Sequence, residues 1–128
     1  MKHVIEISVL IGDGQRLMRE GLATLLELAP DICVVGQAAD GGEAIELARR
    51  LQPDVVLLDI GIPGSDGVTV TRAIRAGSPG TQVLILTTFD DDEALPAVLR
   101  AGACGYLLKD RPSGQLVEAI RAAVASAA

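Results

Sequence analysis

The sequence contains no long apolar run, although 49% of its 128 residues are hydrophobic. A helix that crosses a membrane needs roughly 18 consecutive apolar residues or more, and no stretch approaches this length. A lysine and apolar residues stand near the start of the chain, but Glu6 interrupts them before the core of a signal peptide is reached. We therefore expect a soluble, cytoplasmic protein with one domain, residues 1–128, which is long enough to bury a core.

Basic residues are also few. The chain has 11 Lys and Arg against 17 Asp and Glu, and its formal net charge is -6. The basic residues are scattered, so they form no stripe that could neutralise a nucleic-acid backbone. This composition predicts a domain that binds neither nucleic acid nor a membrane directly.

What the sequence does contain is a series of apolar segments rich in Val, Ile and Leu. They cover residues 4–11, 32–36, 54–59, 82–87 and 104–108. Several of them lack strict alternation of apolar and polar residues, which is typical of strands covered on both faces. Apolar residues with helical spacing lie between or after them, at Met18, Leu22, Leu25, Leu26 and Ala29, and again at Leu116, Ile120 and Ala123. The alternation predicts an α/β fold, a doubly wound parallel sheet of five strands in the order 2-1-3-4-5.

Capping residues agree with this alternation. Asp40 with Glu43 forms a plausible capping pair for the second helix, which Pro53 ends before the third strand. Asp66 is a candidate cap for the third helix, and Gly77 lies near its end. These signals predict short connections between strands and helices.

The fourth helix is irregular in sequence. Asp90 and Glu93 resemble another capping pair, but a helix that started there would contain Pro96. A proline inside a helix lacks a donor and crowds the carbonyl four residues back, at a cost of about 3 kcal/mol. We therefore predict a late start or a distortion between residues 90 and 96.

The two cysteines, Cys33 and Cys104, lack the spacing of metal ligands. Their apolar neighbours predict that both pack in the core. The strand order places them at opposite edges of the sheet, whereas a disulfide needs Cα atoms about 4.4 to 6.8 Å apart. We expect no internal disulfide.

Four polar side chains mark one edge of the predicted sheet. Asp13 follows the first strand, Asp59 ends the third, Thr87 ends the fourth and Lys109 follows the fifth. Ligands of doubly wound sheets bind beyond the carboxyl ends of the strands, where the strand order reverses. Each residue alone fits an ordinary turn, strand end or solvated charge, but together they predict a site.

Three segments carry a family resemblance: DVVLLDIGIPGSDG, LILTTFDDDE and AGACGYLLKD. They resemble the receiver domain of bacterial two-component response regulators of the NarL/FixJ type, and the likeness runs from about Ile7 to Ala123. The resemblance implies a flavodoxin-like fold and a signalling role in transcription regulation rather than an enzyme. It also implies that Asp59 accepts a phosphoryl group from a histidine kinase or a small acyl phosphate.

The resemblance also implies a set of supporting residues. Mg2+ would be held by Asp13, Asp59 and the backbone carbonyl of Gly61, while Thr87 and Lys109 would contact phosphoryl oxygens. Tyr106 would be the aromatic residue that changes rotamer with Thr87. Mg2+ and the Lys109 ammonium are needed because a carboxylate that attacks an anionic phosphoryl group is otherwise repelled.

The segment LIGDGQR departs from the family at Gly14, because family members usually carry two adjacent acids there. Three alternatives follow. Loss of the second acid could impair metal binding and leave a pseudo-receiver that a ligand or a protein regulates without phosphorylation. Gly12 and Gly14 could begin a dinucleotide-binding loop, but Leu17 replaces its third small residue. A haloacid-dehalogenase-type phosphatase would need a second aspartate at position 61, which is Gly61.

The resemblance implies partners beyond this chain. Receivers of this type usually control a C-terminal helix-turn-helix output domain, which the chain does not contain, so DNA binding would belong to that part. A homodimer is plausible through the first and fifth helices or through the face of the fourth helix. Phe89 and the three acids after it are predicted to form a solvated loop and the start of a helix, although Phe89 also stands where it could shield Asp59 from water.

Overall fold

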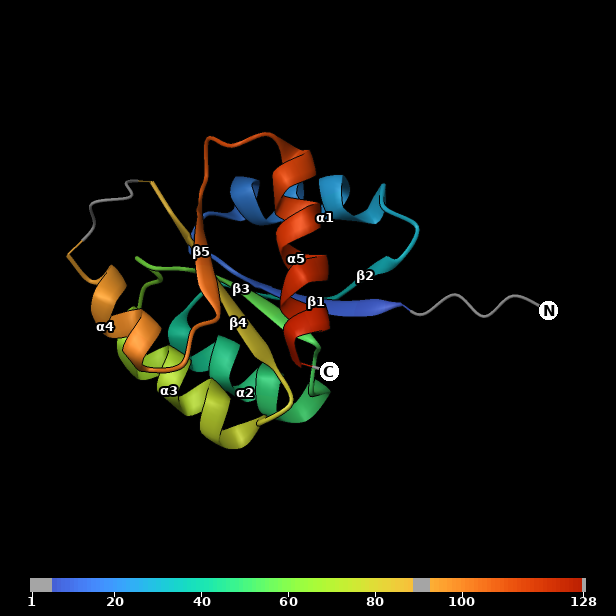
Figure 1. Cartoon of the computed structure of the whole chain (residues 1–128). Coiled ribbons are helices and arrows are strands. Elements are labelled where there is room, and N and C mark those ends of the chain that lie inside the picture. Colours follow the sequence, from blue (N-terminus) through green and yellow to red (C-terminus); the bar gives the residue numbers. More distant parts are fainter. Residues whose placement is uncertain (1–5, 89–92, 128) are drawn as a thin grey trace.

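The computed structural model describes residues 6–88 and 93–127. Within them five parallel strands form one sheet in the order β2-β1-β3-β4-β5 (Figure 1). The strands are β1 (Ile7–Gly12), β2 (Ile32–Ala38), β3 (Val55–Asp59), β4 (Gln82–Thr87) and β5 (Gly105–Leu108). The predicted fold class and strand order are confirmed.

Helices cover both faces of the sheet. They are α1 (Arg16–Glu27), α2 (Gly41–Leu51), α3 (Gly67–Gly77), α4 (Leu95–Arg100) and α5 (Ser113–Ala127). α1 and α5 pack on one face, and α2, α3 and α4 pack on the other (Figure 1). None of these described helices has the length and apolar content that crossing a bilayer requires.

Strand residues divide between two cores by alternation. Along β3, Val55 and Leu57 join the core under α1 and α5, whereas Val56 and Leu58 join the core under α2, α3 and α4. Successive side chains of a strand point to opposite faces, so a strand covered on both sides is apolar throughout. This explains the unbroken apolar segments of the sequence.

The predicted caps form. The carboxylate of Asp40 accepts a hydrogen bond from the amide of Glu43 at 2.8 Å, and Glu43 in turn accepts one from the amide of Ala39 at 2.6 Å. Asp66 accepts a hydrogen bond from the amide of Thr69 at 2.8 Å. α2 ends at Leu51, two residues before Pro53. These contacts fix where both helices begin.

α4 starts late, as the position of Pro96 predicted. Its first residue is Leu95, and Pro96 lies in the first turn, where the backbone amides have no partner within the helix in any case. Asp90, the proposed capping residue, and Phe89, proposed to belong to a solvated loop or to shield Asp59, lie outside the described residues. The remaining helix of six residues is short.

The prediction for the cysteines was right on pairing and wrong on packing. Both are free thiols, and they lie at the two edge strands of the sheet, β2 and β5. Cys33 is half-buried, while Cys104, just before β5, is exposed. An edge strand has a neighbour on one side alone, so an apolar sequence there does not guarantee burial.

Thr71 on α3 provides a test of the core. Among the described residues, its buried hydroxyl has no hydrogen-bond partner. We expect Thr71→Val, which keeps the shape of the side chain, to raise the free energy of unfolding, measured in urea, by about 1 kcal/mol. The reason is that the buried hydroxyl loses its water and gains no hydrogen bond in exchange. Thr81→Val is the matched control. The Thr81 hydroxyl donates to the carbonyl of Pro53, so its removal should lower stability by roughly 1 to 3 kcal/mol.

Candidate functional site

The carboxyl ends of the central strands bring two acids and a lysine together. Asp13 follows β1, Asp59 is the last residue of β3, and Lys109 follows β5. The Lys109 Nζ atom lies 2.9 Å from Asp13 Oδ2 and 3.2 Å from Asp59 Oδ1. The predicted convergence of these three side chains is therefore observed, although they are far apart in sequence.

Asp13 is fully buried and held at each polar atom. Its backbone amide donates to Ala38 at 3.0 Å, and its backbone carbonyl accepts from Nη1 of Arg19 at 2.7 Å. Its carboxylate accepts from the amide of Gln15 at 2.8 Å through Oδ1 and from Lys109 through Oδ2. This acid is placed rigidly behind Lys109 and not at the surface.

Asp59, by contrast, borders open space. It lines a hollow of about 710 Å³, together with Gly61, Pro63, Lys109 and others. The amide of Gly61 donates to Asp59 Oδ1 at 3.3 Å. We call this space the acidic hollow. Asp59 is thus accessible to an incoming group, whereas Asp13 does not line the hollow.

Lys109 carries its charge close to both carboxylates, with 12% of its side chain exposed. Burial by itself would lower the pKa of the ammonium group. The hydrogen bond to Asp13 and the negative charges of Asp59 and Asp13 outweigh this effect and raise the pKa above its ordinary value. Lys109 therefore stays protonated at neutral pH.

Thr87 and Tyr106 lie on the adjacent strands β4 and β5. Thr87 is buried, and its carbonyl accepts a hydrogen bond from the amide of Lys109 at 2.8 Å. It pairs with Leu108 in the sheet, two residues after Tyr106, whose ring is exposed. The structure thus couples the end of β4 to the loop that carries Lys109.

Gly14 is closed in by the loop after β3. A Cβ atom added at Gly14 would lie 2.7 Å from Cδ and 2.9 Å from Cγ of Pro63. Gly12 is packed similarly, because a Cβ there would lie 3.1 Å from Leu58 and 3.3 Å from Ile62. Both glycines are packed closely where a side chain would stand, although Gly14 also lines the acidic hollow. This packing gives the glycines of LIGDGQR a role that needs no bound dinucleotide.

A sequence model of the response regulator receiver domain matches residues 9–121. The chain belongs to the response regulator receiver family. The match covers most of the chain, and the residues outside it are the two termini. The resemblance drawn from the three sequence segments is confirmed.

Relatives of this receiver domain are transcription regulators. The chain is 45% identical over 114 residues to the transcriptional regulatory protein LnrK of Bacillus subtilis, covering 89% of the chain and 52% of LnrK. It is 44% identical over 122 residues to the nitrate/nitrite response regulator protein NarP of Escherichia coli, covering 95% of the chain and 57% of NarP. The receiver domain is thus of the NarL/LuxR type, and it spans about half the length of these curated relatives.

A solved structure agrees. The signal receiver domain of the response regulator NarL from Mycobacterium tuberculosis superposes with a TM-score of 0.89 at 37% identity, covering 94% of this chain and 98% of that one. These findings give no support to the pseudo-receiver hypothesis. A receiver domain is a signalling module, so the phosphatase hypothesis also loses its basis.

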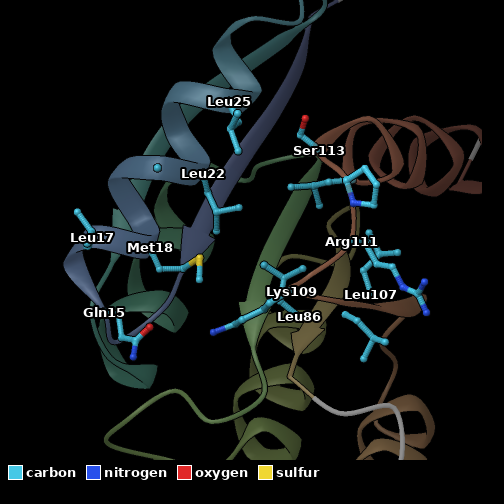
Figure 2. Close-up of a pocket in the computed structure, with 14 residues that line it drawn as sticks. Gln15, Leu17, Met18, Leu22, Leu25, Leu86, Leu107, Lys109, Arg111 and Ser113 are labelled. Atoms are coloured by element: carbon cyan, nitrogen blue, oxygen red, sulfur yellow. The ribbon is translucent and has the colours of Figure 1, made fainter.

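A second hollow adjoins the acidic one on the face of α1 and α5. It has a volume of about 350 Å³ and is mainly apolar, with walls from α1 and from the segment Leu107–Leu116. Figure 2 shows Met18 and Leu22 of α1 pointing into this space, which we call the apolar groove. Gln15, Met18 and Lys109 line both the groove and the acidic hollow.

Three contacts of the site escaped the sequence analysis. The bond from Gln15 to Asp13 spans two residues and is a common side-chain turn, so the Asp13 position alone could have suggested it. Arg19 and Pro63 left no such signal. Their roles depend on how α1 and the loop after β3 lie against the first turn.

Proposed function

We propose that this receiver domain is phosphorylated on Asp59 by a histidine kinase or a small acyl phosphate. The observation that carries the proposal is the Lys109 ammonium, which lies between Asp13 and Asp59 at the edge of the acidic hollow. A carboxylate oxygen of Asp59 forms the new bond to phosphorus. The bond from phosphorus to the donor's acyl oxygen or imidazole nitrogen breaks, and the donor leaves as a carboxylate or an imidazole.

The residues around Asp59 assist the phosphorylation of this side chain. Lys109 contacts the phosphoryl oxygens and offsets the negative charge that accumulates as two anions approach. Thr87 holds another phosphoryl oxygen through its hydroxyl. The domain modifies itself and turns over no separate substrate, which is why we do not class it with enzymes.

The donor set fits Mg2+. Asp59 and Gly61 border the hollow, so Asp59 and the Gly61 carbonyl would hold the ion there, and Asp13 lies behind Lys109. Within the described part of the chain, no group of three or more acidic, histidine or cysteine side chains gathers. Mg2+ is commonly held by one or two carboxylates with several waters, so such a group is not required. When bound, the ion supplies positive charge to the phosphoryl oxygens.

The phosphorylated state acts on an output domain outside this chain. We propose that bonds from the phosphoryl group to Thr87 and Lys109 shift β4 and the loop after β5, and that Tyr106 changes rotamer with Thr87. The relatives named above are transcription regulators about twice as long as the matched region. In keeping with relatives named as transcriptional and response regulators, we propose that the whole protein has a C-terminal DNA-binding domain, a cytoplasmic location and a histidine kinase as its partner.

Intact-protein mass spectrometry after incubation with acetyl phosphate tests this function. We expect a gain of one phosphoryl group that requires Mg2+, and no gain in Asp59→Asn. Peptide mapping after borohydride reduction of the acyl phosphate should place the modification at Asp59. No gain at any Mg2+ concentration, or an equal gain in Asp59→Asn, contradicts the proposal.

We also propose that two copies associate through α1 and α5. Leu17 is 83% exposed, Leu28 is 77% exposed, and Leu25, which its helical spacing placed on the apolar face, is 42% exposed. Leu17 and Leu25 lie on α1 and border the apolar groove, and Leu28 follows the last residue of this helix, so one face offers both protruding apolar side chains and a hollow. A face of this kind can be self-complementary in a two-fold dimer.

Leu17→Glu should weaken this dimer. We expect its dissociation constant, measured by sedimentation of the phosphorylated protein, to rise by about tenfold or more, because a buried carboxylate would lack a partner. Leu99→Glu on α4 is the matched control, since Leu99 is also an exposed leucine, at 38%. A larger effect of Leu99→Glu would assign the interface to the face of α4.

A further inference from the structure

α1 begins without the usual capping contacts. Its N-cap residue, Gln15, makes no side-chain capping bond, and its first turn contains no acid. Instead, two bonds connect the helix to Asp13. The amide of Gln15 donates to Asp13 Oδ1 at 2.8 Å, and Arg19, in the second turn, donates to the Asp13 carbonyl at 2.7 Å. These two bonds thus fix the position of Asp13 relative to the first turns of α1.

The Arg19 bond acts on the peptide that joins Asp13 to Gly14. A glycine at this position adds backbone freedom that a second acid would remove. Fixing the carbonyl fixes the plane of this peptide, and with it the direction in which the Asp13 side chain leaves the backbone. A bond from a charged guanidinium is shorter and stronger than one between neutral groups, and Arg19 is half-buried, which limits competition from water.

We infer that Arg19 is a positioning residue for the acidic site, and that it sets Asp13 for Lys109 and for Mg2+. Arg19 does not line the acidic hollow, so it acts through Asp13 and not on the phosphoryl group. Its importance in this chain follows from Gly14, because Asp13 is the one acid that the turn after β1 supplies. The inference rests on the proposed function, since it assigns Asp13 to that site.

Arg16 offers a matched control on the same helix. Its side chain is 83% exposed and pairs with Glu20 at 2.8 Å, one turn further along. Arg16→Gln therefore removes the same charge from α1 and leaves the bond between Arg19 and Asp13 in place. Arg19→Lys keeps the charge and a donor, but on a shorter chain without the planar fork.

The test is a titration of the 128-residue chain with Mg2+ alone. The midpoint of thermal unfolding is measured at each Mg2+ concentration. Binding to the folded state raises the midpoint, so the titration gives the half-saturating Mg2+ concentration. We expect Arg19→Gln to raise this concentration by about tenfold or more, as the loss of supporting contacts at metal sites does. Arg19→Lys should be intermediate, and Arg16→Gln should match the wild type.

The outcomes separate this inference from the proposed function. If Arg19→Gln lowers the unfolding midpoint but keeps the wild-type Mg2+ response, Arg19 is structural alone and the inference is overturned. The same follows if the wild type shows no Mg2+ response. If Arg19→Gln does not fold, Arg19→Lys and Arg16→Gln provide the test. The inference is then overturned if Arg19→Lys keeps the wild-type half-saturating Mg2+ concentration while Arg16→Gln raises it. Phosphorylation of the wild type with acetyl phosphate decides the proposed function independently of these results.

Discussion

Lys109→Gln is expected to slow phosphorylation by acetyl phosphate by about 10² to 10³-fold, the usual loss when a preorganised charge at a reacting group is removed. The ammonium lies 3.2 Å from Asp59 Oδ1, so it can move to an incoming phosphoryl oxygen without a large rearrangement. Since its pKa is raised, the charge is present at any pH near neutrality. Phosphorylation rates at saturating Mg2+ measure the effect.

Lys109→Gln should affect Mg2+ binding in the opposite direction. The ammonium now neutralises Asp13 and Asp59, and its removal leaves both carboxylates without their cation. We expect the variant to need less Mg2+ for half-saturation, because a divalent ion no longer competes with Lys109. Lys109→Arg, which keeps the charge, should retain part of the phosphorylation rate. A variant that loses Mg2+ binding and phosphorylation together would show that Lys109 has a structural role.

Gly14→Asp is expected to lower the half-saturating Mg2+ concentration by about 10 to 100-fold, because it returns a carboxylate beside the site. The gain has a cost in stability. A Cβ at position 14 would come within 2.7 Å of Pro63, so the loop after β3 must shift, and overpacking of this kind costs about 1 to 3 kcal/mol.

Gly14→Asn is the control for that substitution. It has almost the same size and meets Pro63 in the same way, but it lacks the charge. We expect both variants to unfold at lower urea concentrations than the wild type, with Gly14→Asp alone binding Mg2+ more tightly. Equal Mg2+ responses in the two variants would mean that the added carboxylate does not reach the ion.

The strand order and the meeting of Asp13, Asp59 and Lys109 could be predicted from the sequence. Both follow from rules that act on whole elements. Alternating strands and helices impose a parallel sheet, and residues at the carboxyl ends of its strands must share one edge. The late start of α4 could also be predicted, because a helix that began near Asp90 would contain Pro96 at a cost of about 3 kcal/mol.

The errors and omissions concern contacts between elements. Cys104 was assigned to the core from its apolar neighbours, but β5 is an edge strand and leaves it exposed. Leu25 has the right spacing for the core face of α1, yet it borders a groove that α5 does not fill. The packing of Pro63 on Gly14 depends on the path of a loop 49 residues away, which no local pattern encodes.

The three side chains shared by the acidic hollow and the apolar groove have a thermodynamic consequence. Gln15, Met18 and Lys109 face both spaces, so a group that fills either one changes the surface offered to the other. Linkage is reciprocal. If phosphorylation raises the affinity between two copies by a given factor, association raises the equilibrium constant for phosphorylation by the same factor. Protein concentration would then act as an input to the switch in its own right, and the level of expression would set how readily a given donor turns it on.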